Sequence, residues 1–167
     1  MDERTRLRLV ILRNEVDSDH LLWIRACEHM ADRVNHTVID LTKDDWLLRF
    51  NEGHFDAVLT QPTGWSTAMK ALYDERLARI NERARLPMIP SVSEILIYEN
   101  KRALAAWLQA NGIPHPETHV FSDASAASAF IRTATFPLVA KTSLGAGGRG
   151  VRILRSAANA AAYVERT

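Results

Sequence analysis

One lysine and a glycine-rich loop late in the chain have the composition of a phosphate-binding site. Lys141 ends the apolar run 136–140, and residues 142–150 contain four of the chain's seven glycines. Glycine lets the backbone adopt positive φ angles and approach a ligand closely, and successive free N–H groups form a concave anion site. Residues 151–154 alternate apolar and polar side chains, which predicts a strand. We therefore predict strand, lysine, phosphate-binding loop and strand over 136–154.

Three other nucleotide-binding loops share this composition but differ in context. Residues 145–150 formally match G-x-G-x-x-G, yet that fingerprint leads into a helix, whereas here a predicted strand follows. In protein kinases the lysine comes after the loop, and here Lys141 comes before it. A Walker A motif requires a Gly-Lys pair, which the sequence lacks. The order of lysine, loop and strand therefore excludes these three kinds of site.

The residues before the loop must position it, and the first 92 predict a small α/β domain. We expect strands at 7–12, 37–41, 55–59 and 88–91, and helices at 19–34, 44–50 and 66–85. Such alternation indicates a parallel sheet, whose ligands lie beyond the carboxyl ends of the strands. Glu15 and Gln61 follow the first and third strands. We interpret both as candidate substrate-binding residues, with ordinary solvated loop residues as the alternative.

Two finer expectations concern the helices of this domain. Asp17 or Ser18 can cap the first helix, because both side chains accept hydrogen bonds from free N–H groups. In the helix 66–85 we expect the core-facing residues to be Ala68, Ala71, Leu72, Ile80 and Ala84.

Residues 93–167 predict a second unit, with the boundary near Pro87 and Pro90. A capping box formed by Ser91 and Glu94 precedes a helical region that stops at Asn111-Gly112. We then expect a strand at 118–121, a helix at 124–133 capped by Asp123, the strand–loop–strand of 136–154, and a helix at 157–166 capped by Ser156.

Composition excludes several classes of function. The chain has 21 basic and 20 acidic residues and a net charge of +1, which argues against a nucleic-acid-binding surface. No apolar run approaches the about 20 residues of a membrane helix, and the N-terminus lacks a signal-peptide core. We therefore expect a cytoplasmic protein without nucleic-acid or membrane partners. The six histidines lack metal-ligand spacing, and the single cysteine, Cys27, lies on a predicted core-facing stripe.

Four pieces of the sequence, taken in order, resemble the ATP-grasp superfamily. They are Lys101 and residues 111–116, 136–141 and 145–151. The last two are similar to the nucleotide loop of biotin carboxylases and carbamoyl phosphate synthetases. The preceding α/β unit resembles the domain before the ATP-grasp module in those enzymes and in D-alanine–D-alanine ligases. The resemblance covers essentially the whole chain and implies a small parallel-sheet pre-ATP-grasp domain (1–92) followed by the first α+β sub-domain of an ATP-grasp module (93–167).

This resemblance also implies roles for individual residues. Lys141 and Lys101 would contact the nucleotide phosphates, and Glu15 lies where D-alanine–D-alanine ligases place a substrate-binding glutamate. A lid over the β- and γ-phosphates would be formed, mainly through backbone N–H groups, by Gly145, Ala146, Gly147, Gly148, Arg149 and Gly150. The implied reaction is an ADP-forming ligation of a carboxylate to an amine or thiol through an acyl phosphate, with ATP and Mg²⁺.

The sequence departs from the family pattern at its end. An ATP-grasp module continues with a hinge that binds adenine and a second sub-domain that carries the Mg²⁺ ligands, whereas this sequence stops at Thr167. We therefore expect no metal site in these residues, and a fragment of a longer enzyme that is inactive alone. The alternative is a non-catalytic α/β binding or assembly module whose loop holds a small anion or acts only as a hairpin lid. The mixed-charge face around Arg76 and Arg83 could be ordinary surface or a homodimer contact.

Overall fold

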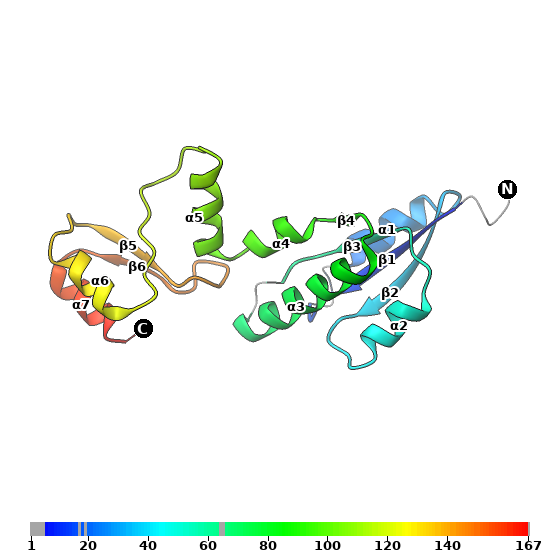
Figure 1. The fold of residues 1–167 in the computed structure, drawn as a ribbon, viewed down its shortest axis with the longest axis horizontal. Coiled ribbons are helices and arrows are strands. Elements are labelled where there is room, and N and C mark those ends of the chain that lie inside the picture. Colours follow the sequence, from blue (N-terminus) through cyan, green and yellow to red (C-terminus); the bar gives the residue numbers. More distant parts are fainter. Residues whose placement is uncertain (1–5, 17, 19, 64–65, 167) are drawn as a thin grey trace. The chain divides into compact units, whose positions relative to one another are not determined.

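The computed structural model describes residues 6–16, 18, 20–63 and 66–166. The chain divides into two compact units, Met1–Tyr98 and Glu99–Thr167 (Figure 1). This boundary lies beyond residue 92, and the assignment of 1–92 and 93–167 as domains stays a prediction. Among the described residues, no helix has the length and apolar composition needed to cross a membrane.

A parallel sheet with helices on both faces forms the first unit, and this confirms the predicted α/β class. Its strands, in the order β2-β1-β3-β4, pair in parallel throughout the described residues. The elements are β1 (Leu7–Arg13), α1 (Leu21–His29), β2 (Val34–Asp40), α2 (Trp46–Glu52), β3 (Ala57–Thr60), α3 (Thr67–Ala84), β4 (Met88–Ile89) and α4 (Val92–Ile97).

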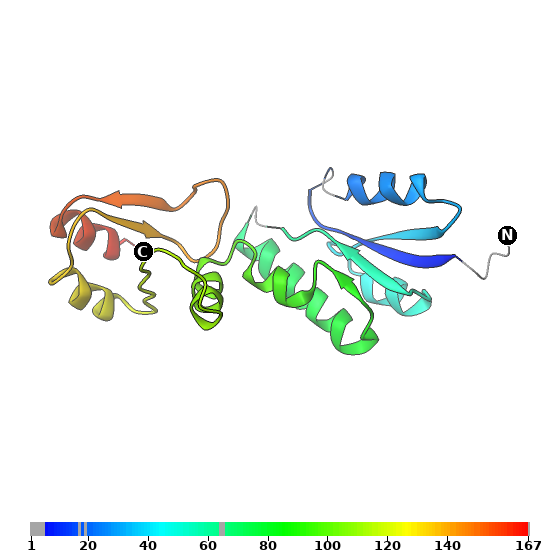
Figure 2. The same cartoon turned by 90° about the horizontal axis from the view of Figure 1, so that it is seen from above.

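Strand β1 is buried on both faces, as is typical of parallel sheets covered by helices. Val10 and Leu12 pack on one side with Tyr73 of α3 and residues of α2 and α4. Ile11 packs on the other side with Cys27 of α1. Figure 2 shows α1 on one side of the sheet and α2 and α3 on the other. The prediction that Cys27 is a core residue is therefore confirmed.

Helix α3 buries a face that matches the predicted one only in part, since Ile80 is buried and Ala84 packs against the core as predicted. Ala68 and Ala71 are exposed, and the buried residues are Lys70, Tyr73, Leu77 and Ile80. Lys70 can be buried because its Nζ atom contacts both carboxylate oxygens of Asp74, at 2.9 and 2.8 Å, and the carbonyl of Ile95 at 3.1 Å. The prediction was therefore confirmed for Ile80 and wrong for Ala68 and Ala71, because the face that meets the core is centred on Tyr73 and Leu77.

The first helix is shorter than predicted. It ends at His29, and Val34 begins β2 instead of ending the helix. Position 20, a histidine, is the N-cap and its side chain makes no capping hydrogen bond. Ser18 accepts from the Leu21 N–H through its carbonyl, so the Ser18 cap was wrong, whereas Asp17 lies outside the described residues.

The second unit is an antiparallel hairpin with helices. Its elements are α5 (Lys101–Ala110), α6 (Ala124–Ile131), β5 (Leu138–Lys141), β6 (Val151–Leu154) and α7 (Ala157–Val164). Helices α6 and α7 pack on one face of the hairpin around Ile131, Leu154 and Ala160. The predicted caps Asp123 and Ser156 are confirmed, since each side chain accepts from the third residue after it.

Two predictions about this second half of the chain were wrong. The helical region after Glu94 is two helices, because Glu99 has a φ of 51° and Asn100 caps α5 by accepting from the Ala103 N–H. Residues 118–121 form no strand; they are exposed and have no partner strand within the described residues 66–166. Pro114 and Pro116 precede these residues, and neither has a backbone N–H group that could extend a strand ladder.

Candidate functional site

The glycine loop joins β5 to β6 and has the backbone geometry that an anion lid requires. Gly145, Gly147, Gly148 and Gly150 have φ angles of 126°, 62°, 73° and 76°, a range that disfavours residues with a Cβ. Within residues 66–166, the N–H groups of Ala146, Gly147, Gly148 and Gly150 have no protein acceptor. Gly147 and Gly148 are exposed. A run of N–H groups open to solvent is what an anion-binding nest consists of.

The first half of this loop is fixed to the beginning of α5. Backbone hydrogen bonds join the Lys101 N–H to the Ser143 carbonyl at 2.8 Å and the Gly145 N–H to the Glu99 carbonyl at 3.3 Å. The Ser143 hydroxyl donates to the Asn100 side chain at 3.2 Å. The loop is therefore anchored at residues 143–145, while residues 146–149 project beyond the anchor. Sequence reasoning missed this anchor, because its two sides lie more than 40 residues apart.

The two predicted phosphate-binding lysines lie in different surroundings. Lys141 ends β5 and is exposed. Lys101 is partly buried, and its Nζ atom donates to the Gly145 carbonyl at 2.6 Å. An ammonium has three donors, so this hydrogen bond leaves Lys101 able to contact a further acceptor beside the loop. Arg149 is exposed, and its backbone N–H donates to the Ala146 carbonyl at 3.2 Å.

Lys141 shares one face of the hairpin with exposed apolar side chains. The antiparallel register pairs Val139 with Ile153 and Lys141 with Val151, and side chains two residues apart on a strand lie on the same face. Val139 and Ile153 are 58% and 59% exposed. Leu138 and Leu154 point to the other face, where α6 and α7 cover them. The hairpin thus presents an apolar surface that ends in a cation.

In the first unit, polar side chains gather where β1 and β3 end. These neighbouring strands connect to opposite sides of the sheet, since β1 is followed by β2 and β3 by β4. Ligands of open α/β sheets bind at such a switch point. Asn14 is 1% exposed, and its Nδ2 atom donates to the Gln61 carbonyl at 3.0 Å. Gln61 itself is half-buried, so the structure places this predicted residue at the switch point.

Only one of the two carboxylate oxygens of Glu15 has a hydrogen-bond partner among the described residues. Thr63, which is 2% exposed, donates its hydroxyl hydrogen bond to Glu15 Oε1. Glu15 Oε2 is buried and has no partner among the described residues. An unpaired buried carboxylate oxygen is costly, and a ligand that brings a hydrogen-bond donor would remove that cost. The sequence indicated Glu15 as a candidate but gave no sign of Thr63, which lies 48 residues away.

A buried hydrogen-bonded chain supports these strand ends. Thr60 and Tyr73 are 0% and 2% exposed, and their hydroxyl oxygens lie 2.5 Å apart. Tyr73 also donates to the Leu12 carbonyl at 3.1 Å, and Trp23 Nε1 donates to the Thr60 carbonyl at 3.2 Å. The ends of β1 and β3 are therefore tied to α1 and α3 by side chains.

The described residues contain no group of three or more His, Cys, Asp or Glu side chains that could hold a metal ion.

Comparison with solved structures identifies the fold. The RimK domain protein ATP-grasp from Sphaerobacter thermophilus DSM 20745 matches with a TM-score of 0.63 and 20% identity, over 95% of this chain and 59% of that one. N5-carboxyaminoimidazole ribonucleotide synthetase from Thermus thermophilus matches with a TM-score of 0.62 and 18% identity, over 91% and 42%. This chain has the fold of the N-terminal part of ATP-grasp enzymes.

A third ATP-grasp structure supports the same assignment of the fold. The biotin carboxylase domain of Hydrogenobacter thermophilus 2-oxoglutarate carboxylase matches with a TM-score of 0.64 and 19% identity, over 95% of this chain and 40% of that one. That structure is a dimer in complex with MgADP, ADP and bicarbonate. The chain thus spans between 40% and 59% of the length of these three proteins. No protein-family model and no curated protein matches the sequence.

Proposed function

We propose that this chain is the N-terminal portion of an ATP-dependent, ADP-forming ligase that joins a carboxylate to an amine or a thiol. The observation that carries the proposal is the glycine loop, whose N–H groups at 146–148 have no acceptor among residues 66–166, beside the exposed Lys141. The ATP-grasp fold supports a nucleotide as the ligand.

The loop would bind the β- and γ-phosphates of ATP, and the residues present fit such a group. Backbone N–H groups of Gly147 and Gly148 would donate to phosphate oxygens, and the Lys141 ammonium would compensate part of the phosphate charge. Lys101 would hold the loop through the Gly145 carbonyl and offer its remaining donors to the same phosphates. Positioning and charge compensation supply most of the catalysis in phosphoryl transfer.

The switch point of the first unit would bind substrate. Glu15 Oε2 needs a donor, and the ammonium group of an amine substrate supplies one in a charge-assisted hydrogen bond. Gln61, whose carbonyl already accepts from Asn14, would offer its side-chain amide beside it. This proposal favours an amine over a thiol as the second substrate, because a thiol is a weak donor.

The ligation itself would proceed in two displacements. A carboxylate oxygen attacks the γ-phosphorus, and the bond from that phosphorus to the bridging oxygen breaks, which releases ADP. The substrate ammonium loses one proton to solvent, and the neutral amine nitrogen then attacks the acyl carbon. The carbon–oxygen bond to phosphate breaks, and the nitrogen loses a second proton as phosphate leaves. The 167 residues alone would not turn over, because the rest of the nucleotide site would come from the remainder of the module.

The test is ADP release by the native full-length gene product, measured against a panel of carboxylates and amines. The proposal predicts ADP release that requires one carboxylate and one amine together. The alternative, a binding or assembly module, predicts ADP release no faster than buffer with every pair. Ligation catalysed by the purified 167 residues would contradict the proposal that they are an incomplete part.

A further inference from the structure

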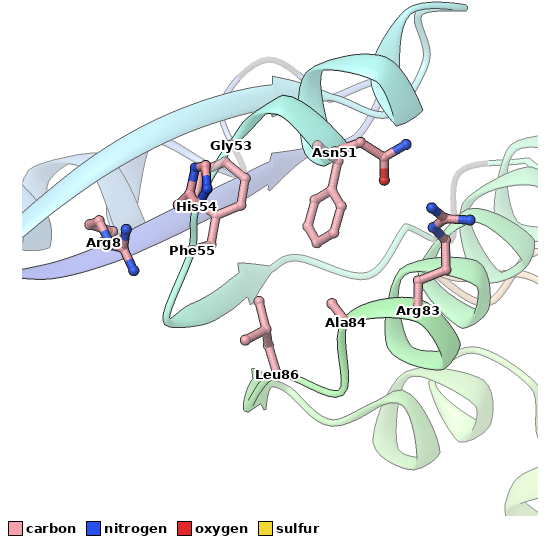
Figure 3. Close-up of a pocket in the computed structure, with 9 residues that line it drawn as sticks. Arg8, Asn51, Gly53, His54, Phe55, Arg83, Ala84 and Leu86 are labelled. Atoms are coloured by element: carbon pink, nitrogen blue, oxygen red, sulfur yellow. The ribbon is translucent and has the colours of Figure 1, made fainter.

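A pocket of about 330 Å³ lies in the first unit (Figure 3). It is found at the ends of the strands opposite to those that form the switch point. It is bounded by the beginning of β1, the loop between α2 and β3, and the end of α3. Arg8 and Asn14 lie six residues apart along the chain at β1, which at about 3.3 Å per residue separates the two edges by about 20 Å. Neither the proposed nucleotide loop nor the proposed substrate residues line this pocket.

The floor of the pocket is aromatic and aliphatic. The rings of Phe50 and Phe55 have centroids 5.5 Å apart and are tilted by 40°, and Ala84 and Leu86 complete the floor. Gly53 makes this arrangement possible, because a Cβ at that position would collide with the Phe55 ring. Phe50 is 6% exposed and belongs to the core, so the half-buried ring of Phe55 is the one that a ligand ring can contact.

The rim carries positive charge and no acid. Of the residues that line the pocket, the ionisable ones are Arg8, His54 and Arg83. Arg8 is already paired, because its Nε and Nη2 atoms donate to the two carboxylate oxygens of Asp56 at 3.2 and 2.9 Å. Arg83 has no ion-pair partner among the described residues and lies in the last turn of α3. In Figure 3 its guanidinium extends from α3 at the side of the pocket where Asn51 also lies.

We propose that this pocket binds a small aromatic carboxylate, with its ring on Phe55 and its carboxylate on Arg83. The volume is at the lower end of the range of about 300 to 1,000 Å³ found for small-molecule sites, which suits a single ring. The guanidinium is the group that recognises a carboxylate through two parallel hydrogen bonds. Asn51 contributes a neutral donor on the same rim.

The test is an NMR titration of the 167-residue chain with benzoate, followed at the backbone amides. We expect saturable shifts at Gly53, His54 and Phe55. Acetate lacks the ring and benzyl alcohol lacks the charge, so each should bind at least about tenfold more weakly than benzoate. Equal affinity for benzoate and either comparison ligand would overturn the proposal, as would the absence of saturable shifts at these amides below about 50 mM benzoate.

Three variants distinguish the contribution of the Arg83 charge to benzoate binding from that of the apolar floor. Arg83→Met should weaken benzoate about tenfold, since it removes a charge-assisted contact, and Ala84→Leu should weaken it similarly by filling the pocket. Arg79→Met is the matched control, because Arg79 lies on the same helix and does not line the pocket. Unchanged affinity in Arg83→Met, or an equal loss in Arg79→Met, would contradict the proposal. Arg83 is exposed, so its replacement should leave the fold intact.

Discussion

The glycine loop of the second unit and the switch point of the first unit present polar groups by opposite means. The loop uses backbone N–H groups on a strand-to-strand connection, and Gly147 and Gly148 at its tip are exposed. The switch point uses side chains, and Asn14 and Thr63 there are almost fully buried. The first site therefore depends on the absence of Cβ atoms, and the second on hydrogen bonds between residues far apart in sequence. Substitutions should affect the two sites differently.

The largest expected loss of stability comes from a substitution among the hydrogen-bonded side chains beneath the switch point. Tyr73→Ala removes a buried ring and the hydroxyl that contacts Thr60 and Leu12, and should lower the free energy of unfolding by about 4 kcal/mol. Lys141→Ala in the exposed hairpin should change it by less than about 0.5 kcal/mol. Urea unfolding followed by circular dichroism measures both. A Tyr73→Ala loss below about 1 kcal/mol would show that the chain does not support the strand ends.

Glu15→Gln should separate binding from folding at the switch point. We expect the KM for the amine substrate of the full-length protein to rise by about tenfold or more, because a charge-assisted hydrogen bond is lost. The free energy of unfolding should change little, because the partly buried negative charge is removed while the carbonyl oxygen of Gln can still accept from Thr63. Glu28→Gln on the exposed face of α1 is the control and should leave both quantities unchanged. An unaltered KM in Glu15→Gln would remove the substrate role.

In the loop, two alanine substitutions form a matched pair. Gly150→Ala should cost about 1 to 3 kcal/mol, because φ is 76° and the new Cβ would meet Thr142. Gly147→Ala should cost only about 1 kcal/mol, because φ is 62° but no atom lies within 4 Å of the added Cβ. Unfolding experiments in urea give the order of the two. The reverse order would mean that the hairpin is not closed by the contact between residues 142 and 150.

The smallest expected effect concerns the acid stability of the first unit, at the ends of its strands opposite to the switch point. The Arg8 guanidinium and backbone N–H hold the pKa of Asp56 at about 2, below its ordinary value of 3.8. Because the folded-state pKa is lowered, this stabilisation is present above about pH 4 and is lost as the pH falls through about 2. Asp56→Asn should therefore flatten the dependence of unfolding free energy on pH between about 4 and 2. The same slope in both proteins would show that the ion pair does not form in solution.

Features that depend on neighbouring residues could be predicted from the sequence. The capping box of Ser91 and Glu94 is present, and the chain leaves α5 at Asn111 with Gly112 at a φ of 63°. The four glycines of the loop have the positive φ angles that their clustering predicted. Each of these follows from backbone preferences acting over a few residues.

Features that depend on distant partners could not be predicted in the same way. Lys70 is buried because Ile95, 25 residues later, accepts its hydrogen bond. The helical region breaks at Glu99 because that residue's carbonyl pairs with the Gly145 N–H and Asn100 caps the next helix. At the switch point, Glu15 was predicted as a candidate from its place after a strand, but its contact with Thr63 depends on the order of the strands in the sheet.

The measurement that tests the central claim most directly is the dissociation constant of ATP for the native full-length protein and two variants. Lys141→Ala removes the exposed cation that would face the phosphates, and Arg152→Ala removes an exposed cation on the neighbouring strand and the opposite face of the hairpin. If the loop and Lys141 bind the phosphates, Lys141→Ala weakens ATP binding by about tenfold or more and Arg152→Ala by less than about twofold. Equal dissociation constants for the wild-type protein and Lys141→Ala would contradict the account.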